Sequence, residues 1–181
     1  MINAEHLYLL RRIFLYRCQR MQPSRMLRKE REMNKAETEQ FLCEAKVGRL
    51  GVCCNNEPYI VPVLFVYIRE TETIYVHSAK KGKKISIMET NPNLCFEIDD
   101  MSTITFDKSP CNSSLIYRSV IAFGEAAFIN DSKAKAEALN MIMQKYANES
   151  KVDSITPEMA KKTQIIMFKI VSKTGKENKK A

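Results

Sequence analysis

Three short runs of β-branched and aromatic residues, joined by two tight turns, constrain the fold of this chain more than any other feature. The runs are 49–54, 59–68 and 74–77, and the turns are Asn55-Asn56 and 69–73. Strands joined by turns of two to five residues pair as antiparallel hairpins. The sequence therefore predicts an antiparallel meander in this region.

Further strands and helices are predicted on both sides of the meander. Asn34 is predicted to cap a helix that ends at Gly48, with Glu37 at the reciprocal position of a capping box. The other predicted elements are a helix over 83–89, a strand over 94–99, a polar loop over 102–114, a strand over 115–129, a helix capped by Asp131 or Ser132 with Leu139, Ile142, Met143 and Tyr146 on one side, and a last strand over 164–171. This order predicts a mainly β fold with flanking helices, arranged as a six-stranded antiparallel barrel that is closed or nearly closed.

Two residues inside the strands indicate where such a barrel is irregular. Pro62 has no amide to donate to a strand ladder, so it marks an edge strand or a bulge, and the sequence leaves both open. At a bulge, the neighbouring backbone groups are free to bind a ligand. Gly124 lies in the middle of a long predicted strand, as expected where a barrel wall bends.

The segment 75–84 is the first candidate for a binding site. It passes from a strand that ends at His77, through four lysines around Gly82, into a predicted helix. Unpaired amides at a helix start attract anions and lysines strengthen that attraction, so the segment is suited to hold a phosphate. Alternatively, the lysines only solubilise the helix end and His77 is an ordinary core histidine. The spacing of nucleoside-triphosphate and dinucleotide loops is missing, which argues against kinase, GTPase and Rossmann dehydrogenase functions.

The net charge of +8 is concentrated at the two ends of the chain. Residues 1–25 and 169–181 each carry five basic residues and one acidic residue, and the body between them is neutral. Nucleic acid is therefore not a predicted partner. We expect 1–25 to be a basic extension that can form a helix, 26–171 to be the folded domain, and 172–181 to be a disordered lysine-rich tail.

Six cysteines show no pair with metal-ligand spacing, and only two histidines are available to complete a metal set, so no metal site is predicted. Most of the cysteines are expected to be buried, reduced thiols of a cytoplasmic protein. The apolar start of the chain is interrupted by Arg11-Arg12 and lacks a small-residue cleavage site. Neither a secretory leader nor stable membrane insertion is expected.

Several short segments follow one another in a characteristic order. They are Gly48-Arg49-Leu50-Gly51, Pro58-Tyr59-Ile60-Val61-Pro62-Val63, Tyr75-Val76-His77-Ser78-Ala79, Gly82-Lys83-Lys84 and Tyr117-Arg118-Ser119-Val120. Together they resemble the pyridoxamine-phosphate-oxidase-like flavin-binding split barrels, specifically the nitroimidazole-resistance branch. The resemblance runs from about Met26 to Val171, nearly the whole predicted domain.

The resemblance implies a six-stranded split barrel of the type that binds flavin mononucleotide (FMN), and a homodimer with one FMN in each of two clefts between the subunits. The cofactor-binding residues implied are Lys83 and Lys84 for the phosphate, the backbone of Pro62, Val63 and Leu64 for the ring edge, His77, Ser78 and Ala79 between these contacts, and Tyr117, Arg118 and Ser119 on a further strand. Side chains alternate along a strand, so Arg118 faces away from its two neighbours unless the strand bulges there. The alternative for Arg118 is a salt bridge at the interface.

The activity that the resemblance implies is reduction of a small molecule by electrons carried on the flavin, with NADH or NADPH as the donor. In the nitroimidazole-resistance branch the substrate is the nitro group of a 5-nitroimidazole, which is reduced to an amine. His77 is the candidate catalytic residue nearest the substrate, because an imidazole can donate a proton near neutral pH, and Tyr117 could share that role.

Three other functions stay open. A pyridoxamine-phosphate oxidase would need a second phosphate site, and no group of arginine and histidine near the C-terminus provides one. A flavin- or haem-binding protein with little turnover is compatible with the sequence, with His77 as a haem ligand. Binding of nucleic acid or anionic membranes through the basic ends is disfavoured by the neutral body and by the lack of interleaved aromatic and basic residues.

Overall fold

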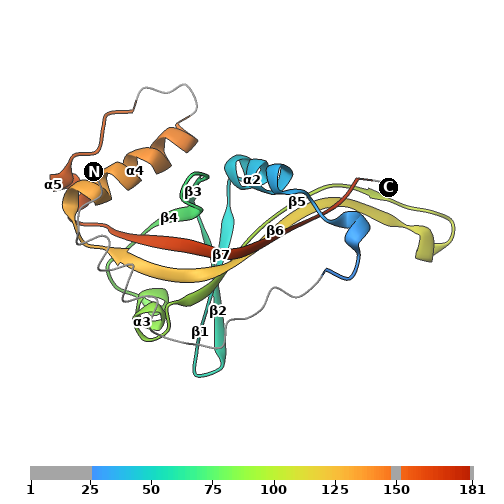
Figure 1. The fold of residues 1–181 in the computed structure, drawn as a ribbon, viewed down its shortest axis with the longest axis horizontal. Coiled ribbons are helices and arrows are strands. Elements are labelled where there is room, and N and C mark those ends of the chain that lie inside the picture. Colours follow the sequence, from blue (N-terminus) through green and yellow to red (C-terminus); the bar gives the residue numbers. More distant parts are fainter. Residues whose placement is uncertain (1–25, 148–151, 180–181) are drawn as a thin grey trace.

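The computed structural model describes residues 26–147 and 152–179. They form one antiparallel sheet that curls around a hydrophobic core and is flanked by helices, which confirms the predicted fold class (Figure 1). The strands are β1 (Gly48–Cys54), β2 (Glu57–Val63), β3 (Phe65–Ile68), β4 (Thr73–Ser78), β5 (Asn93–Thr105), β6 (Ser114–Ile129) and β7 (Gln164–Asn178). The helices are η1 (Lys29–Arg31), α2 (Lys35–Glu44), α3 (Lys83–Thr90), η2 (Pro110–Asn112), α4 (Ser132–Tyr146) and α5 (Pro157–Ala160). The predicted N-terminal extension, 1–25, lies outside the described residues.

Within the described residues, the sheet has seven strands rather than the predicted six, and no strand ladder closes it. The strand order is β2-β1-β5-β6-β7-β4-β3, so β2 and β3 stand at opposite edges. The sequence predicts these two strands as one, over 59–68, but Leu64 separates them and belongs to neither ladder. The sheet therefore curls until its edges meet at Leu64, where the chain itself joins them. Pro62 lies in an edge strand, where a missing amide donor is tolerated.

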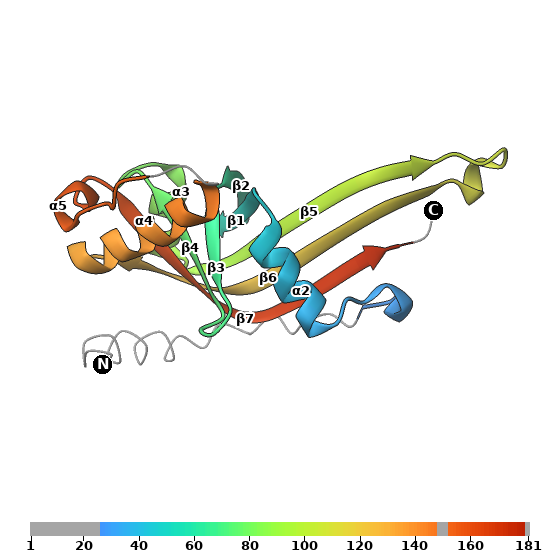
Figure 2. The same cartoon turned by 90° about the horizontal axis from the view of Figure 1, so that it is seen from above.

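β5 and β6 form a long arm that projects from the rest of the molecule (Figures 1 and 2). β5 continues to Thr105 and β6 begins at Ser114, so the predicted loop over 102–114 is largely strand and the short helix η2. From Asp99 onward every residue of β5 is exposed. The alternation of buried and exposed side chains that identifies a half-buried strand is therefore lost along the arm.

β7 is also longer than predicted, because its second half pairs with β6. The ladder runs from Phe123 opposite Ser172 to Tyr117 opposite Asn178. The prediction of a disordered tail from residue 172 is therefore wrong for residues 172–178. The lysine-rich residues 172–178 cannot form a hydrophobic core of their own, but the neighbouring strand β6 supplies partners for their backbone hydrogen bonds.

Three phenylalanine rings lie at the centre of the core, inside the curled sheet. The ring centroids of Phe65 and Phe96 are 4.8 Å apart, and those of Phe96 and Phe168 are 6.2 Å apart. Helix α2 adds Phe41 and Leu42 to this core. The predicted capping box at its start is confirmed: the side chain of Asn34 accepts from the amide of Glu37, and the Glu37 carboxylate accepts from the amide of Asn34.

Helix α4 packs on β3, β4 and β7, and Asp131 caps it as predicted by accepting from the amide of Ala134. In its predicted apolar stripe, Ile142 is buried and Met143 is exposed. The hydroxyl of Tyr146, the last residue of the stripe, accepts from the amide of Phe65 (3.0 Å) and donates to the carbonyl of Lys46 (2.8 Å). α4 thus holds the chain in place next to the strand break.

The turns and the bend follow the sequence predictions. Asn55 and Asn56 have φ values of 51° and 64°, as a two-residue hairpin turn requires. The register of β6 and β7 shifts between Phe123 and Gly124. A Cβ atom on Gly124 would lie 2.0 Å from the carbonyl oxygen of Lys169, so only glycine allows this close approach of the two strands.

The cysteines differ from the prediction. Five lie in the described ranges, all as free thiols, and none of the five is buried: Cys43 and Cys111 are exposed, and Cys53, Cys54 and Cys95 are half-buried. The predicted buried thiols were assigned from residue type alone. Cys53 and Cys95 lie on the side of the sheet away from the core, and Cys54, at the end of β1, packs only partly against the core. Among the helices that the structure describes, none is long and apolar enough to cross a bilayer.

Candidate functional site

The strand register brings three of the predicted site residues to one face of the sheet. Pro62 pairs with Arg49, which also pairs with Glu97 on β5. Further along β5, Asp99 pairs with Ser119 and Met101 pairs with Tyr117. Partners across a ladder share a face, and so do residues two apart along a strand. Pro62, Ser119 and Tyr117 therefore all point away from the core, onto what we call the outer face.

The outer face also carries large apolar side chains that nothing in the described chain covers. They are Ile60 on β2, Met101 on β5 and Ile121 on β6, which are 64%, 59% and 39% exposed. Just beyond β5, Phe106 is 82% exposed. Exposed apolar side chains that gather on one face, rather than lying scattered, are typical of a surface that contacts a ligand or another chain.

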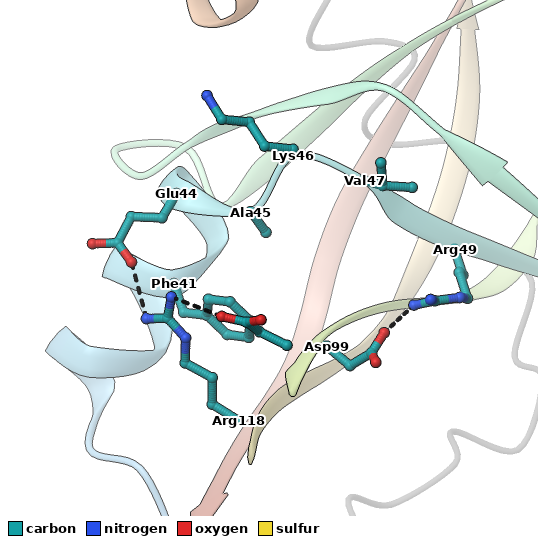
Figure 3. A pocket seen from close by; sticks show the side chains of 9 residues that line it. Phe41, Glu44, Ala45, Lys46, Val47, Arg49, Asp99 and Arg118 are labelled. Carbon is teal, nitrogen blue, oxygen red and sulfur yellow. Dashed lines mark hydrogen bonds and ion pairs between the residues drawn. The ribbon is translucent and has the colours of Figure 1, made fainter. Parts of the chain in front are cut away.

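Arg118 points to the other side of β6, towards α2. Its guanidinium lies 4.1 Å from the ring centroid of Phe41 and is paired with Glu44 (3.0 Å), as drawn in Figure 3. It also pairs with Asp100 (3.4 Å). Hydrogen bonds from Gln40 and Arg118 lower the pKa of Glu44. Arg118 therefore forms salt bridges within its own chain, and it does not share a face with Tyr117 and Ser119.

A depression of about 340 Å³ opens beside this cluster (Figure 3). Its lining residues come from α2, the segment after it, β1, β5 and β6: Phe41, Glu44, Ala45, Lys46, Val47, Arg49, Asp99, Asp100 and Arg118. Arg49 is paired with Glu97 (2.9 Å) and with Asp99. Burial raises the pKa of Glu97 despite this contact. Most of the charged side chains that line the depression form ion pairs with one another. A ligand there would meet hydrogen-bond donors and acceptors rather than an unpaired charge.

Sequence reasoning missed the part that Arg49 and the β5 carboxylates play in this depression. The sequence does show a wet face of β5 with Glu97 and Asp99, and an arginine directly after Gly48. Only the strand order places β1 next to β5 and so brings these charges together.

The end of β4 brings His77 next to the predicted ring-edge residues. Phe65 pairs with Val76, so Leu64 and His77 stand one step beyond the last pair of this ladder. His77 is exposed and Ser78 is buried, as expected for consecutive residues on opposite faces of a strand. The predicted contacts of Pro62, Val63 and Leu64 therefore lie close to His77.

The start of α3 has the features of an anion site. Gly82 precedes the helix with φ 135°, a conformation that favours glycine, and no side chain of the described residues caps the helix. The carbonyl of Gly82 accepts from the amides of Ile85 and Ser86, which leaves the amides of Lys83 and Lys84 as first-turn donors that point out of the helix. Lys83 is exposed, with its ammonium 5.0 Å from the ring centroid of Tyr59, and Lys84 is half-buried.

A buried hydroxyl at the end of β4 supports the same interpretation. The Oγ of Ser78 is buried without a hydrogen-bond partner in the part of the chain that the structure describes. Buried hydroxyls are nearly always bonded, so an orphaned one points to a group that binds there. The hydroxyl is a donor that lies five residues before Lys83 along the chain, and donors and cations of this kind are suited to bind an anion.

The two candidate catalytic residues lie far apart within one chain. His77 pairs with Ile165 and Tyr117 pairs with Asn178, thirteen positions apart on β7. At roughly 3.3 Å per residue this corresponds to about 40 Å along the strand. One chain therefore cannot bring both side chains to the same substrate. Within the described ranges, no cluster of three or more His, Cys, Asp and Glu side chains is arranged to hold a metal ion.

Comparisons with known proteins identify the family. A family model described as pyridoxamine 5'-phosphate oxidase matches residues 34–177. No curated protein sequence matches the chain. A proposed 5-nitroimidazole antibiotic resistance protein from Bacteroides thetaiotaomicron is similar in structure, with a TM-score of 0.70, 25% sequence identity, and coverage of 80% of this chain and 85% of that chain.

Two further solved structures share the fold. The FAD and haem binding protein from Mycobacterium smegmatis has a TM-score of 0.74 at 14% identity, covering 83% of this chain and 74% of that chain. An FAD-binding protein from Mesorhizobium loti has a TM-score of 0.61 at 20% identity, covering 82% and 97%. Because the family model spans most of the sequence, from the cap of α2 almost to the end of β7, the chain belongs to the pyridoxamine 5'-phosphate oxidase-like family.

Proposed function

We propose that this protein is a flavin-dependent oxidoreductase that binds FMN and reduces a small molecule, such as the nitro group of a 5-nitroimidazole, to an amine. The observation that supports this most strongly is the uncapped, lysine-rich start of α3 beside the orphaned hydroxyl of Ser78. The similarity to a proposed 5-nitroimidazole antibiotic resistance protein supports the choice of substrate class.

The residues that would hold FMN fall into two groups. Lys83 and Lys84, with their backbone amides, would bind the phosphate. The backbone near Pro62, Val63 and Leu64 would bind the ring edge, since Leu64 lies outside both ladders and Pro62 is on an edge strand. When bound, the flavin supplies the redox chemistry, with NADH or NADPH as the proposed electron donor.

We further propose that the active form is a homodimer with the cofactor between its subunits. The separation of His77 and Tyr117 along β7 supports this, because a site that uses both must draw them from different chains. The exposed apolar side chains of the outer face, next to Pro62 and Tyr117, give such a contact a surface to bury.

His77 is the proposed proton donor to the substrate. It is exposed at the end of β4 and adjacent to Leu64, so it can reach a small molecule that sits at the ring edge. The hydroxyl of Tyr117 would approach the same substrate from the other subunit and hydrogen-bond to it. Arg118, which is engaged by Glu44 and Asp100, would support α2 rather than the cofactor.

Cofactor binding is tested with the full chain and a pair of double variants. Lys83→Ala/Lys84→Ala should lose FMN, measured by flavin absorption after gel filtration and by titration of the FMN-free protein. Lys161→Ala/Lys162→Ala removes two exposed lysines after α5 and should retain it. Wild-type affinity for FMN in the first variant would contradict the phosphate site, and a Soret band in the purified protein would identify haem instead.

Activity is tested by anaerobic reduction of the flavin-loaded protein with NADH or NADPH, followed by mixing with a 5-nitroimidazole. We expect reoxidation of the flavin on mixing. The six-electron reduction of a nitro group needs three two-electron turnovers of the flavin, so with excess NADH or NADPH present we expect an amine product by mass spectrometry. A protein that binds FMN but is not reoxidised by the nitro compound would act on a different substrate.

A further inference from the structure

Lys145, near the end of α4, is half-buried, and its amine lies against aromatic rings. The Nζ atom is 3.7 Å from the ring centroid of Phe65 and 5.6 Å from that of Tyr146. It also donates to the carbonyl of Leu42, in the last turn of α2, at 3.5 Å. Ring faces and a helix C-terminus attract a cation, but they do not neutralise it as a carboxylate would.

Burial lowers the pKa of Lys145 to about 8, and the nearby charge of Lys46 acts in the same direction. At pH 7 about a tenth of the molecules then carry a neutral amine here, roughly 300-fold more than for a lysine with its ordinary pKa of 10.5. The neutral amine is the nucleophilic form, and catalytic lysines in proteins are activated by the same kind of burial. The proposed flavin chemistry does not use this amine.

A second nucleophile, the thiol of Cys43, is close to this amine. Cys43 directly follows Leu42, so the carbonyl carbon of the group that accepts from Lys145 is bonded to the nitrogen of Cys43. Standard bond lengths then place Nζ of Lys145 at most about 7.5 Å from the Cα atom of Cys43. The two side chains also interact electrostatically, since Cys43 partly offsets the effect of burial on the pKa of Lys145. Cys43 is a free, exposed thiol, so a reagent in solution can reach it.

We propose that Cys43 and Lys145 form an acylation site, in which the thiol takes an acyl group from an acyl thioester and passes it to the amine. In the first step the sulfur of Cys43 attacks the thioester carbonyl, the carbon–sulfur bond of the reagent breaks, and the reagent leaves as a thiol with the proton of Cys43. In the second step the neutral amine of Lys145 attacks the new thioester, an amide bond forms, and the sulfur of Cys43 leaves and takes up a proton from the amine. No oxidant or reductant takes part. The flexible stem of a lysine lets its amine move towards the bound acyl group.

The first test incubates the full chain with acetyl-coenzyme A at a pH of about 8, where about half of the Lys145 amine is neutral, and maps the products by mass spectrometry. Lys145 should be acetylated roughly 10-fold or more faster than Lys133, an exposed lysine on the same helix. Cys43→Ser should remove this advantage, because delivery from a neighbouring thiol raises the local concentration of the acyl group. Cys111→Ser, which removes another exposed thiol, should leave the advantage unchanged.

The thioester intermediate is trapped with Lys145→Arg, which keeps the positive charge but has no amine to accept the acyl group. This variant should accumulate acetyl groups on Cys43 that hydroxylamine removes, since hydroxylamine cleaves thioesters and leaves amides intact. In the wild type the acetyl group should be found on Lys145 and should resist hydroxylamine. Equal amounts of thioester in both proteins would show that Cys43 does not pass its acyl group to Lys145, and would overturn the proposal.

A reagent that needs no thiol shows whether Cys43→Ser still presents the amine. Acetic anhydride should acetylate Lys145 to the same extent in the wild type and in Cys43→Ser, and the two proteins should have the same melting temperature. Should Cys43→Ser melt at a lower temperature, the thioester trapped in Lys145→Arg decides the question with Cys43 in place.

Two outcomes would contradict the acylation site directly. In one, acetic anhydride does not reach Lys145 in the wild type. In the other, acetyl-coenzyme A labels Lys145 equally with and without Cys43. Neither outcome depends on a bound flavin, so failure of this inference leaves the proposed function untouched.

Discussion

Lys173 forms an ion pair with Glu72 that ties the second half of β7 to the turn between β3 and β4. The hydroxyl of Tyr67 also donates to the Glu72 carboxylate (3.0 Å), and the Lys173 ammonium lies 3.4 Å from Glu39 on α2. Lys173, in the segment expected to be a disordered tail, therefore lies between two carboxylates and links β7 to the β3–β4 turn and to α2.

Stability should depend on pH through Glu72. Burial alone would raise the pKa of Glu72, but the hydrogen bonds from Lys173 and Tyr67 outweigh it and lower the pKa below the ordinary value of 4.5. A carboxylate with a lowered folded-state pKa adds stability above its unfolded-state pKa, and this stability is lost as the pH falls through the folded-state value. Glu72→Gln should lower the free energy of unfolding in urea by about 1–3 kcal/mol at pH 7.

The difference between wild type and Glu72→Gln should shrink below a pH of about 4, because protonation then removes the charge in the wild type as well. Glu70→Gln is the matched control, since Glu70 lies in the same turn and is exposed. A difference that is constant between pH 7 and pH 3.5 would contradict the role of the ion pair.

Gly124 should not tolerate a side chain. A Cβ atom there would lie 2.0 Å from the carbonyl oxygen of Lys169 and 2.8 Å from the ring of Phe168, and backbone cannot move aside as a side-chain end can. Gly124→Ala should cost roughly 3 kcal/mol or more in urea unfolding, or prevent folding. Gly51→Ala is the control, because its Cβ would meet nothing closer than 3.5 Å, and it should cost much less.

The arm should contribute to self-association. Ile104 and Phe106 are 49% and 82% exposed at its end, and both are apolar. Ile104→Lys/Phe106→Ser should shift the protein from dimer to monomer in size-exclusion chromatography with light scattering, and should weaken FMN binding if the cofactor lies between subunits. Met159→Ser removes a 60% exposed apolar side chain on α5 and should leave the dimer intact. Unchanged dimers in the arm variant would place the interface elsewhere.

Subunit mixing should reveal whether His77 and Tyr117 act in one site. His77→Ala should reduce turnover of the flavin-loaded enzyme by about 100-fold or more, as loss of a general acid does. If each site takes His77 from one chain and Tyr117 from the other, a mixed dimer of His77→Ala and Tyr117→Phe chains has one site with both wild-type residues.

An equal mixture that has been unfolded and refolded together should then recover roughly a quarter of wild-type activity, since half of the dimers are mixed and half of their sites are intact. The control is the same two variants refolded separately and then combined. If the refolded mixture is no more active than this control, the two residues do not meet across an interface.

Local signals in the sequence determined the elements near turns and helix ends. The capping box at Asn34, the two-residue turn at Asn55-Asn56 and the cap at Asp131 depend on contacts within four residues, and all three formed as predicted. The lysine-rich helix start after Gly82 is local in the same sense, and its uncapped amides follow from the residues themselves. Such features are readable in a sequence because distant parts of the chain hardly affect them.

Tertiary pairing decided the rest. The outer half of β5 and the second half of β7 have no apolar alternation, and they are strands because long neighbours supply hydrogen bonds along their whole length. The break at Leu64 and the distance between His77 and Tyr117 both follow from the strand order. Strand order and register are set by contacts between residues far apart in the chain, so no local pattern in the sequence carries them.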